Sequence, residues 1–448
     1  MYQPHPLDFL FVAQLGWSQP VKFGEFSLAL HFQCIRYPLI FSIPSSRMTL
    51  ESSSWRHDLK AFLLIVLLAI LFGDVGYGLQ INITVLDNAT TQGAVCLDGS
   101  PPAYYFDKGF DTGLSNWIIF LDIFHIIYGG GWCESIPDCN NRSITEKGSS
   151  KNMKNQSQFA GILHSTPRQN PDFYNWNRVW VNYCDGPSFT GDVEHVDPEN
   201  KLYFRGARLF KVAMVDLWRK GMQYAKNAIL SGTSTGGLAT ILNCDKCKSF
   251  FPDNAVKVKF VANAGFFINA NTIFGTPNIQ NMYERVVNLH ESAKRACTPT
   301  MEPSLCFFPE NIIPYIETPL FIINSAYDAW HISNTLVPSN LDPQHAWEYC
   351  RDQISNCTSS QIINIQAFGA EFLNILKGLT PCYTRGYFIT SWHTHARIVL
   401  GDYGFDATSP RILNKTIAEA IGDWYFDRTT FHQHIDLYPG ARCCKRST

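Results

Sequence analysis

The stretch from Leu230 to Gly237 places the strongest constraint on how this chain can fold. It has the form G-x-S-x-G around Ser234, after an apolar run at 228–230 that predicts a buried strand and before a helix start at 238–242. Small residues permit the sharp strand-to-helix turn that lifts a hydroxyl clear of a sheet, so Ser234 is a candidate nucleophile. Turns without chemistry also contain this pattern, so the rest of the chain has to decide.

The composition excludes several classes of protein. The chain has 448 residues, of which 46% are hydrophobic and 17% charged, and this balance predicts one or two globular domains with an ordinary core. The formal net charge is -2 and no long Lys/Arg run occurs. We therefore expect neither nucleic acid nor an anionic membrane surface as a partner.

Residues 61–72 form an unbroken apolar run of twelve residues with basic residues shortly before it. A bilayer span needs about 20 apolar residues, so the run predicts the hydrophobic core of a secretory signal peptide at 48–78. A signal peptide begins a chain, so we expect Met48 to be the natural start and 1–47 to be an upstream extension. If Met1 is used instead, the run could serve as a signal anchor.

Sequons for N-glycosylation all follow the expected signal peptide. The six are Asn82, Asn88, Asn141, Asn155, Asn356 and Asn414. Sequons arise by chance, but this distribution is typical of a secreted glycoprotein whose acceptors lie on surface loops.

The cysteines support the same compartment. Of 14 cysteines only Cys34 precedes the expected signal peptide, and an odd number remaining leaves at least one thiol unpaired among expected disulfides. Cys244 and Cys247 form a C-x-x-C. Without a second such pair or a thioredoxin-like context, a disulfide or two buried thiols is favoured over a zinc or redox site.

A glycine triplet follows the apolar run 117–128. Gly129, Gly130 and Gly131 precede Trp132, and glycines at a strand end free backbone N–H groups for close approach to a ligand. In serine hydrolases this position supplies part of the oxyanion hole, although a flexible turn explains the triplet equally well by itself.

Two later strand ends carry candidate partners for Ser234. A buried strand at 319–324 precedes Asp328, and a strand at 386–391 precedes His393 and His395. The order serine, aspartate, histidine is that of α/β-hydrolases, although Asp328 alone could be a loop cap. His-x-His can also bind metal and recurs at 432–434, but no acidic or cysteine partner stands at ligand spacing.

Several motifs in one order give a more specific indication. They are AVCLDGSPPAYY at 94–105, GGGWC at 129–133, YCDGPSFTGD at 183–192, SGTSTGGLAT at 231–240, NAGFFINA at 263–270, NSAYDAW at 324–330 and NKTIAEAIGDWYFDR at 414–428. This set closely resembles the plant pectin acetylesterases, which are carbohydrate esterases of α/β-hydrolase type. The resemblance covers most of the expected mature chain.

The resemblance implies one α/β-hydrolase domain at 79–448, with a central, mostly parallel sheet and helices on both faces. It implies a carboxylic ester hydrolase that removes acetyl groups from pectin, with Ser234 as nucleophile, His395 as base and Asp328 as the acid that orients the base. The implied oxyanion donors are the backbone N–H groups of Gly131, Trp132 and Thr235. His393 falls on a variable position of the family pattern.

The resemblance also implies partners and location. We expect acetylated pectin as substrate, a secreted monomer in the cell wall, no metal or organic cofactor, and no membrane span after signal cleavage. Two alternatives stay open. One is a related carboxylesterase such as a lipid deacylase, and the other is a wall-glycan binding protein with misaligned triad residues.

The chain departs from the family pattern near the candidate site. Cysteines of the pattern are replaced by Thr233, Trp392 and Ala396, so a disulfide that would hold the histidine loop is missing, and acids are replaced by Asn263 and Asn269. Six mostly apolar residues, 123–128, also separate an acid, Asp122, from the glycine triplet. We expect such an insert to displace the oxyanion donors, and we hypothesise that it is an unusual splice product or a gene-model error.

Overall fold

The computed structural model describes residues 79–122, 131–251, 255–292, 299–379, 384–396, 405, 409–436 and 440–441. The expected extension at 1–47, the expected signal peptide at 48–78 and the insert at 123–128 lie outside the described residues. Gly78 to Thr448 form one compact unit. In the described part of the chain, no helix has the length and apolar content needed to cross a bilayer.

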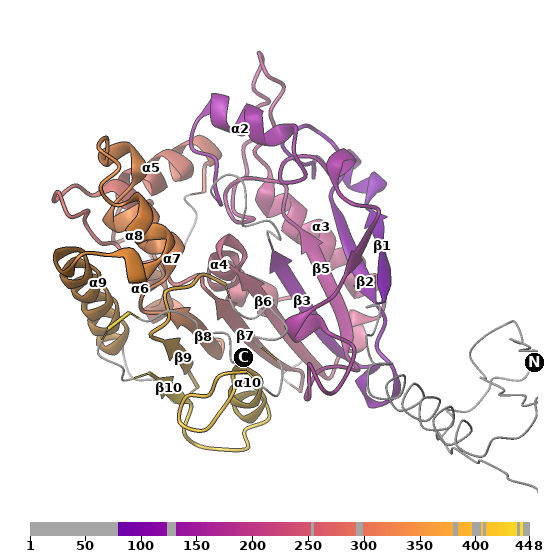
Figure 1. The fold of residues 1–448 in the computed structure, drawn as a ribbon. Coiled ribbons are helices and arrows are strands. Elements are labelled where there is room, and N and C mark those ends of the chain that lie inside the picture. The colour runs from indigo at the N-terminus through magenta and orange to yellow at the C-terminus, as the bar shows by residue number, and fades with distance from the viewer. Residues whose placement is uncertain are drawn as a thin grey trace, which may run out of the picture. The chain divides into compact units, whose positions relative to one another are not determined.

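A ten-stranded sheet runs through this unit in the order β10-β9-β8-β7-β6-β3-β5-β2-β1-β4 (Figure 1). Its strands are β1 Gln80–Val85, β2 Ala103–Asp107, β3 Asn116–Asp122, β4 Gln156–Gln158, β5 Asn177–Asn182, β6 Asn227–Thr233, β7 Lys257–Asn263, β8 Leu320–Ser325, β9 Gly386–Thr390 and β10 Gln433–Ile435. From β10 to β5 all neighbours are parallel, whereas β2, β1 and β4 add antiparallel pairs at one edge. The expected α/β class with a mostly parallel sheet is confirmed.

The central strands are apolar on both faces, as strands covered by helices on both sides must be. Along β3, Trp117, Ile119 and Leu121 face one core cluster. The alternating Ile118 and Phe120 face the other. Because side chains of a strand point alternately to opposite faces, one short segment joins the two halves of the core.

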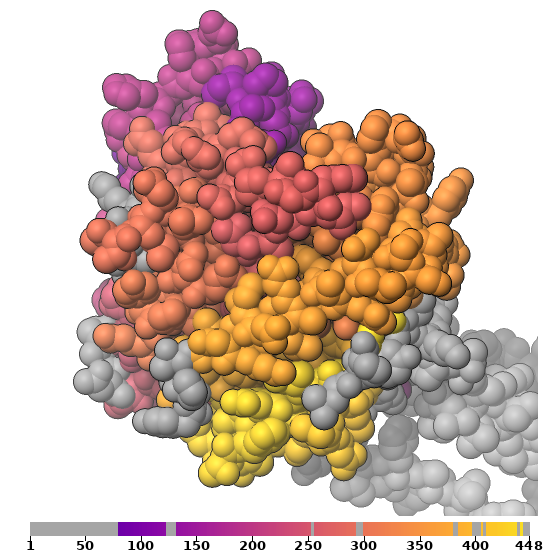
Figure 2. All heavy atoms as spheres, turned by 90° about the vertical axis from the view of Figure 1, so that its left-hand side faces the viewer, coloured from indigo at the N-terminus to yellow at the C-terminus, as the bar shows by residue number. Residues whose placement is uncertain are grey.

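Helices cover both faces of the sheet. They are α2 Ile136–Ser143, α3 Gly206–Arg219, α4 Thr235–Lys248, α5 Asn278–His290, α6 Pro309–Ile312, α7 Ala329–His331, α8 Glu348–Asp352, α9 Ser359–Gly378 and α10 Ile417–Tyr425. Buried residues of α3, α4, α5 and α9 belong to one core cluster, and those of α10 belong to the other. Figure 2 shows the face where orange atoms of the α8 and α9 segments lie beside the salmon atoms of the α5 segment.

Two helices are shorter than their sequence patterns suggest. The helical spacing of 208–226 predicts one helix, but α3 ends at Arg219 because Gly221 adopts a left-handed conformation with φ 116. A 3-10 turn, η5 Met222–Tyr224, then leads into β6. The motif at 414–428, which resembles the terminal helix of the family, is helical only over α10, which begins at a Thr416 capping box.

Disulfides tie loops to the unit, and those whose two cysteines both lie in the described residues are Cys96–Cys184, Cys133–Cys139 and Cys350–Cys357. Cys244 and Cys247 are free and buried in α4, as the preferred interpretation of their spacing allows. Burial raises the pKa of both thiols, so neither is a ready nucleophile or metal ligand.

All six sequon asparagines are exposed. Asn82 lies on β1, Asn141 on α2, and Asn88 and Asn356 lie in the 3-10 helices Asp87–Gln92 and Ile354–Asn356, so four acceptors sit on regular elements and not on loops as expected. Their exposure leaves each open to a glycan.

The start of α4 packs directly against the chain that leaves β7, and this contact predicts a sensitive position. A Cβ at Gly265 would lie 2.3 Å from the carbonyl carbon of Gly237. We expect Gly265→Ala to lower the free energy of unfolding by about 1–3 kcal/mol, because backbone must move to admit the methyl group. Urea unfolding measures the change.

Gly378 provides the matched control, because it ends α9 and a Cβ there would meet nothing within 4 Å. Gly378→Ala should either raise the free energy of unfolding or lower it by less than about 0.5 kcal/mol. Equal losses for the two variants would refute the packing argument.

Candidate active site

Ser234 stands on a strained turn between β6 and α4. Its backbone has φ 58 and ψ -121, and it is the N-cap residue of the helix. The Ser234 N–H donates to the Asn263 carbonyl at 2.9 Å, which fixes the turn to the end of the neighbouring strand β7. A non-glycine residue in this region costs about 1–3 kcal/mol and persists only where its surroundings hold it.

The glycines around Ser234 are required by close backbone approach. A Cβ at Gly232 would lie 2.3 Å from the Gly236 carbonyl oxygen, and one at Gly237 would lie 2.4 Å from the Asn263 carbonyl oxygen. No side chain fits at these two positions without a shift of the backbone. Close packing of the backbone thus explains why glycines stand on both sides of the serine.

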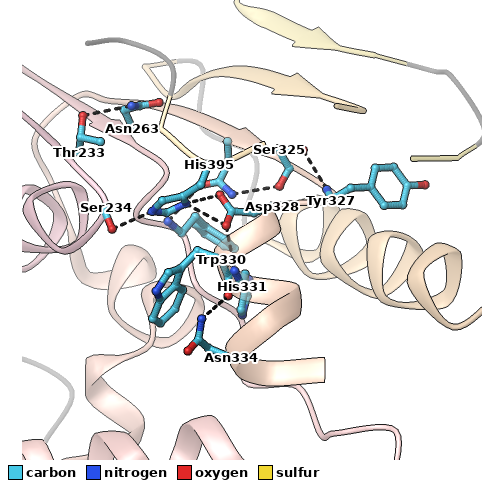
Figure 3. Close-up of polar contacts among 12 residues, drawn as sticks. Thr233, Ser234, Asn263, Ser325, Tyr327, Asp328, Trp330, His331, Asn334 and His395 are labelled. Carbon is cyan, nitrogen blue, oxygen red and sulfur yellow. Dashed lines mark hydrogen bonds and ion pairs between the residues drawn. The ribbon is translucent and has the colours of Figure 1, made fainter. Parts of the chain in front are cut away.

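The candidate triad residues are joined by hydrogen bonds in one line (Figure 3). His395 Nε2 lies 2.8 Å from Ser234 Oγ, and His395 Nδ1 lies 2.7 Å from Asp328 Oδ2 and 2.9 Å from Asp328 Oδ1. The side chains of Asp328 and His395 are 2% and 9% exposed. The pairing leaves His395 Nε2 as the acceptor of the Ser234 hydroxyl proton when the imidazole is neutral.

Asp328 is held by the segment that follows β8. It caps α7, and its Oδ1 accepts from the His331 N–H at 2.9 Å. His331 itself is fully buried, and this burial lowers its pKa to about 4, so it adds no positive charge beside Asp328 near neutral pH. The Asp328 carboxylate is therefore left to pair with the His395 imidazole.

The loop that carries His395 is held by hydrogen bonds and not by a disulfide at the positions of the family pattern. Ser325 Oγ donates to the Trp392 carbonyl, and the Ala329 N–H donates to the Thr394 carbonyl at 3.3 Å. Both donors come from the segment that also carries Asp328. The acid and the base are thus positioned together, although Trp392 and Ala396 replace the cysteines.

The two expected oxyanion segments meet beside Ser234. A Cβ at Gly131 would lie 1.9 Å from Thr235 Cγ2, so the Gly131 backbone lies directly against the first residue of α4. The first N–H groups of a helix have no acceptor within the helix, which leaves that of Thr235 available. The expected donors Gly131 and Thr235 are therefore brought together, while residues 123–130 lie outside the described part.

Two residues that were not singled out from the sequence brace this loop. Tyr183 Oη donates to the Gly131 carbonyl at 2.9 Å and accepts from the Ser188 N–H at 3.1 Å. Ser188 Oγ accepts from Trp132 Nε1 at 2.9 Å. The sequence signal for these contacts is the polar, glycine-containing segment at 183–192, which follows β5. Because β5 neighbours β3, the loop after β5 must emerge beside the glycine loop that follows β3.

Thr233 and Asn263, which depart from the family pattern, form a pair of their own. Asn263 Nδ2 donates to Thr233 Oγ1 at 3.1 Å, so one residue supports the nucleophile turn through both its carbonyl and its amide (Figure 3). Sequence spacing could not reveal this pair, because register Thr233↔Asn263 arises only when β6 and β7 align.

Aromatic side chains form a wall next to the triad. The half-buried Trp330 lies 6.1 Å from the His395 ring and 5.1 Å from Phe267, by ring centroids. Trp132 packs edge-on against both aromatic residues.

Metal ligands are not assembled around the triad in the described residues. There, the group with suitable spacing is Cys133, Cys139 and His290, but the two sulfurs are bonded to each other. A disulfide sulfur is not the thiolate that metals require, so this group does not fit a metal.

A mostly parallel sheet that carries serine on a strand-to-helix turn, followed by aspartate and histidine on later strand ends, defines an α/β-hydrolase. A family model described as pectinacetylesterase matches residues 77–445. The chain thus belongs to the pectin acetylesterase family and is a carboxylic ester hydrolase.

Individual relatives agree with this assignment. The chain is 47% identical to pectin acetylesterase 11 of Arabidopsis thaliana over 364 residues, which cover 80% of this chain and 90% of that protein. It is 45% identical to pectin acetylesterase 7 of the same plant over 377 residues, covering 82% and 93%. The solved structure of the Wnt deacylase Notum from Drosophila has the same fold, with a TM-score of 0.67 at 21% identity, covering 82% of this chain and 98% of that chain.

The contact between Gly131 and Thr235 predicts a compensating pair of substitutions. Gly131→Ala should lower kcat of the esterase by about 10²-fold or more, because the new methyl group displaces a candidate oxyanion donor. Thr235→Ser alone should have a small effect, since it removes only Cγ2. The double variant should recover much of the lost kcat, measured as acetate release under saturating substrate.

Recovery is the decisive outcome, because it requires that the two groups collide. A double variant no better than Gly131→Ala alone would show that the glycine is needed for another reason, and the proposed proximity of the two donors would lose its support.

Proposed function

We propose that this protein is a serine esterase that hydrolyses O-acetyl esters of cell-wall pectin and releases acetate. The observation that carries the proposal is the line of hydrogen bonds from Ser234 through His395 to Asp328, in a chain of the pectin acetylesterase family. The names of the Arabidopsis relatives supply the substrate class.

In the first half of the reaction, Ser234 Oγ attacks the acetyl carbonyl carbon while His395 Nε2 takes the hydroxyl proton. The resulting oxyanion accepts hydrogen bonds from the N–H groups of Gly131, Trp132 and Thr235, and each such donor is typically worth about 3 kcal/mol. The carbon–oxygen bond to the sugar then breaks. His395 returns its proton to the sugar oxygen as that oxygen leaves.

In the second half, His395 removes a proton from water, and the hydroxide attacks the acetyl group on Ser234. Collapse of the second tetrahedral intermediate breaks the bond to Oγ while His395 returns its proton to that oxygen, which releases acetate and restores the serine. Asp328 keeps Nδ1 protonated and stabilises the imidazolium at both stages. The residues present perform each step without a further group.

A lipid deacylase is the rival activity, because the solved structure with the same fold is that of a Wnt deacylase and because aromatic rings lie beside the triad. The two activities differ in acyl length. A preference for 4-nitrophenyl octanoate over 4-nitrophenyl acetate, with little acetate released from acetylated pectin, would favour the rival. Pectin binding without turnover would favour a binding protein.

We also propose that the protein is exported and acts as a monomer in the wall. The apolar run at 61–72 and the sequons support export, and the exposure of all six sequon asparagines is compatible with glycosylation. Export also suits the three disulfides, which persist in oxidising compartments.

Removal of single triad groups tests the mechanism. Ser234→Ala and His395→Ala should each lower kcat/KM for acetate release from acetylated pectin by about 10⁶-fold, and Asp328→Asn by about 10⁴-fold. His393→Ala is the control, because this neighbouring histidine has no part in the line of hydrogen bonds. If His393→Ala is as damaging as His395→Ala, the assignment of the base is wrong.

The pH profile tests the same base independently. The logarithm of kcat/KM should fall on the acid side with the titration of a single group, because a protonated His395 cannot accept the Ser234 proton. Stopped assays with 4-nitrophenyl acetate between about pH 4 and pH 8 measure the profile. The prediction fails if no acid limb appears, or if the limb is unchanged when His395 is replaced in a variant that is still active.

Folding must be followed at each pH, because two buried histidines resist protonation. Burial lowers the pKa of His290 and His331 to about 4, below the usual value near 6.5. The unfolded chain therefore binds these protons first, and stability present above about pH 6.5 is lost as the pH falls towards about 4. Near-UV circular dichroism separates this loss from titration of the base.

A further inference from the structure

The connection between α3 and β6 presents aromatic and basic side chains to solvent. Trp218 is 42% exposed and Tyr224 is 75% exposed. Leu217, Met222 and Ala225 of the same segment point into the core. The exposed residues, called here the 218–226 surface, are Trp218, Arg219, Lys220, Gln223, Tyr224 and Lys226.

This surface is positively charged in a chain whose formal net charge is -2. Arg219 and Lys226 have no carboxylate within 4.0 Å among the described residues, and Lys220 lies 4.0 Å from Asp216. Asp216 in turn accepts a hydrogen bond from Tyr104 Oη at 2.6 Å. Within the described part of the chain, the three cations of this surface thus have a single carboxylate within 4.0 Å, that of Asp216, which also binds Tyr104.

The surface continues onto neighbouring elements. The Lys226 N–H donates to the Ser115 carbonyl at 2.8 Å, which brings the 54% exposed Leu114 next to it. On α3, the exposed Lys211 precedes Trp218 by two helical turns and so lies on the same side of the helix. Apolar rings and positive charges therefore share one side of the unit.

Flat aromatic faces beside unpaired cations suit a polymer of acidic sugars. The C–H faces of a pyranose ring stack on aromatic rings, and a carboxylate on each sugar can pair with Lys or Arg. We propose that the 218–226 surface is a second, non-catalytic binding site for galacturonan stretches of pectin. The identity of the polymer rests on the proposed function, whereas the charge and the aromatic faces do not.

The position of this surface separates it from ester hydrolysis. Strand β6 begins at Asn227, directly after the surface, and ends at Thr233, directly before Ser234. At about 3.3 Å per residue the strand spans roughly 23 Å. The surface therefore lies at the amino ends of the parallel strands, whereas the triad lies at their carboxyl ends. A site there holds the polymer near the enzyme and raises the local concentration of acetyl groups at Ser234.

A cavity outside the triad does not offer the same chemistry. It has a volume of about 390 Å³ beside α4 and is lined by three carboxylates, those of Asp192, Asp245 and Glu291, against Lys246. An acidic polymer would be repelled there. Charge complementarity favours the 218–226 surface.

Binding to polygalacturonate without acetyl groups tests the proposal apart from catalysis. We expect Trp218→Ala/Tyr224→Ala and Arg219→Glu/Lys226→Glu each to raise the Kd, measured by isothermal titration calorimetry, by about fivefold or more. The charge-reversed variant should also lose most of the salt dependence of binding. Hydrolysis of 4-nitrophenyl acetate should be unchanged, while KM for acetylated pectin should rise at constant kcat.

Tyr349 provides the matched control, because it is 74% exposed but lies in α8 beside Glu348 and Asp352. Tyr349→Ala should leave polygalacturonate binding unchanged. The proposal is overturned if the 218–226 variants bind polygalacturonate as tightly as the parent, or if Tyr349→Ala weakens binding equally. Failure of the proposed function is a different result, namely no acetate release from acetylated pectin by the parent protein.

Discussion

The backbone at Ser234 is forced into a conformation that a serine does not favour, and the parts of the site depend on the contacts that hold it there. The Ser234 N–H donates a hydrogen bond to the Asn263 carbonyl. Gly232 and Gly237, which have no side chain, allow the backbone on both sides of the turn to pack closely. The strain is offset by a hydrogen bond and by close packing on both sides. The same packing sets Thr235 at the start of α4, next to Gly131.

Positioning of the acid and the base follows from neighbouring strands. The loops after β8 and β9 leave the sheet side by side, and hydrogen bonds from Ser325 and Ala329 hold the loop that carries His395. The disulfides Cys133–Cys139 and Cys96–Cys184 adjoin Trp132 and Tyr183 beside the glycine loop. Hydrogen bonds thus align the triad, while these disulfides restrict the segments around the candidate oxyanion loop.

The two ends of the parallel strands have different chemistry. Loops at the carboxyl ends bring Ser234, Asp328 and His395 together with an aromatic wall. The turn that precedes β6, at the amino end, carries cations and exposed rings instead. A fold of this kind can separate bond cleavage from the proposed attachment to a polymer, because each parallel strand is preceded by a loop at its amino end and followed by another at its carboxyl end.

The sequence by itself determined the class of fold, the order of the strands that carry chemistry and the three triad candidates. These features are local: apolar segments, a glycine-flanked serine, and an acid and a histidine at later strand ends. Local patterns can be recognised in a sequence without knowing which residues contact each other in the fold. The ends of helices could be predicted less well from the sequence. Helix α3 ends after Arg219 because Gly221 adopts a left-handed conformation, although the sequence pattern around it remains helical. Only the tertiary structure decided that Thr233 pairs with Asn263, that Tyr183 braces Gly131, and that hydrogen bonds hold the histidine loop where the cysteines are missing. Each of these contacts joins residues from different strands or loops, and their register is set by packing of the whole sheet.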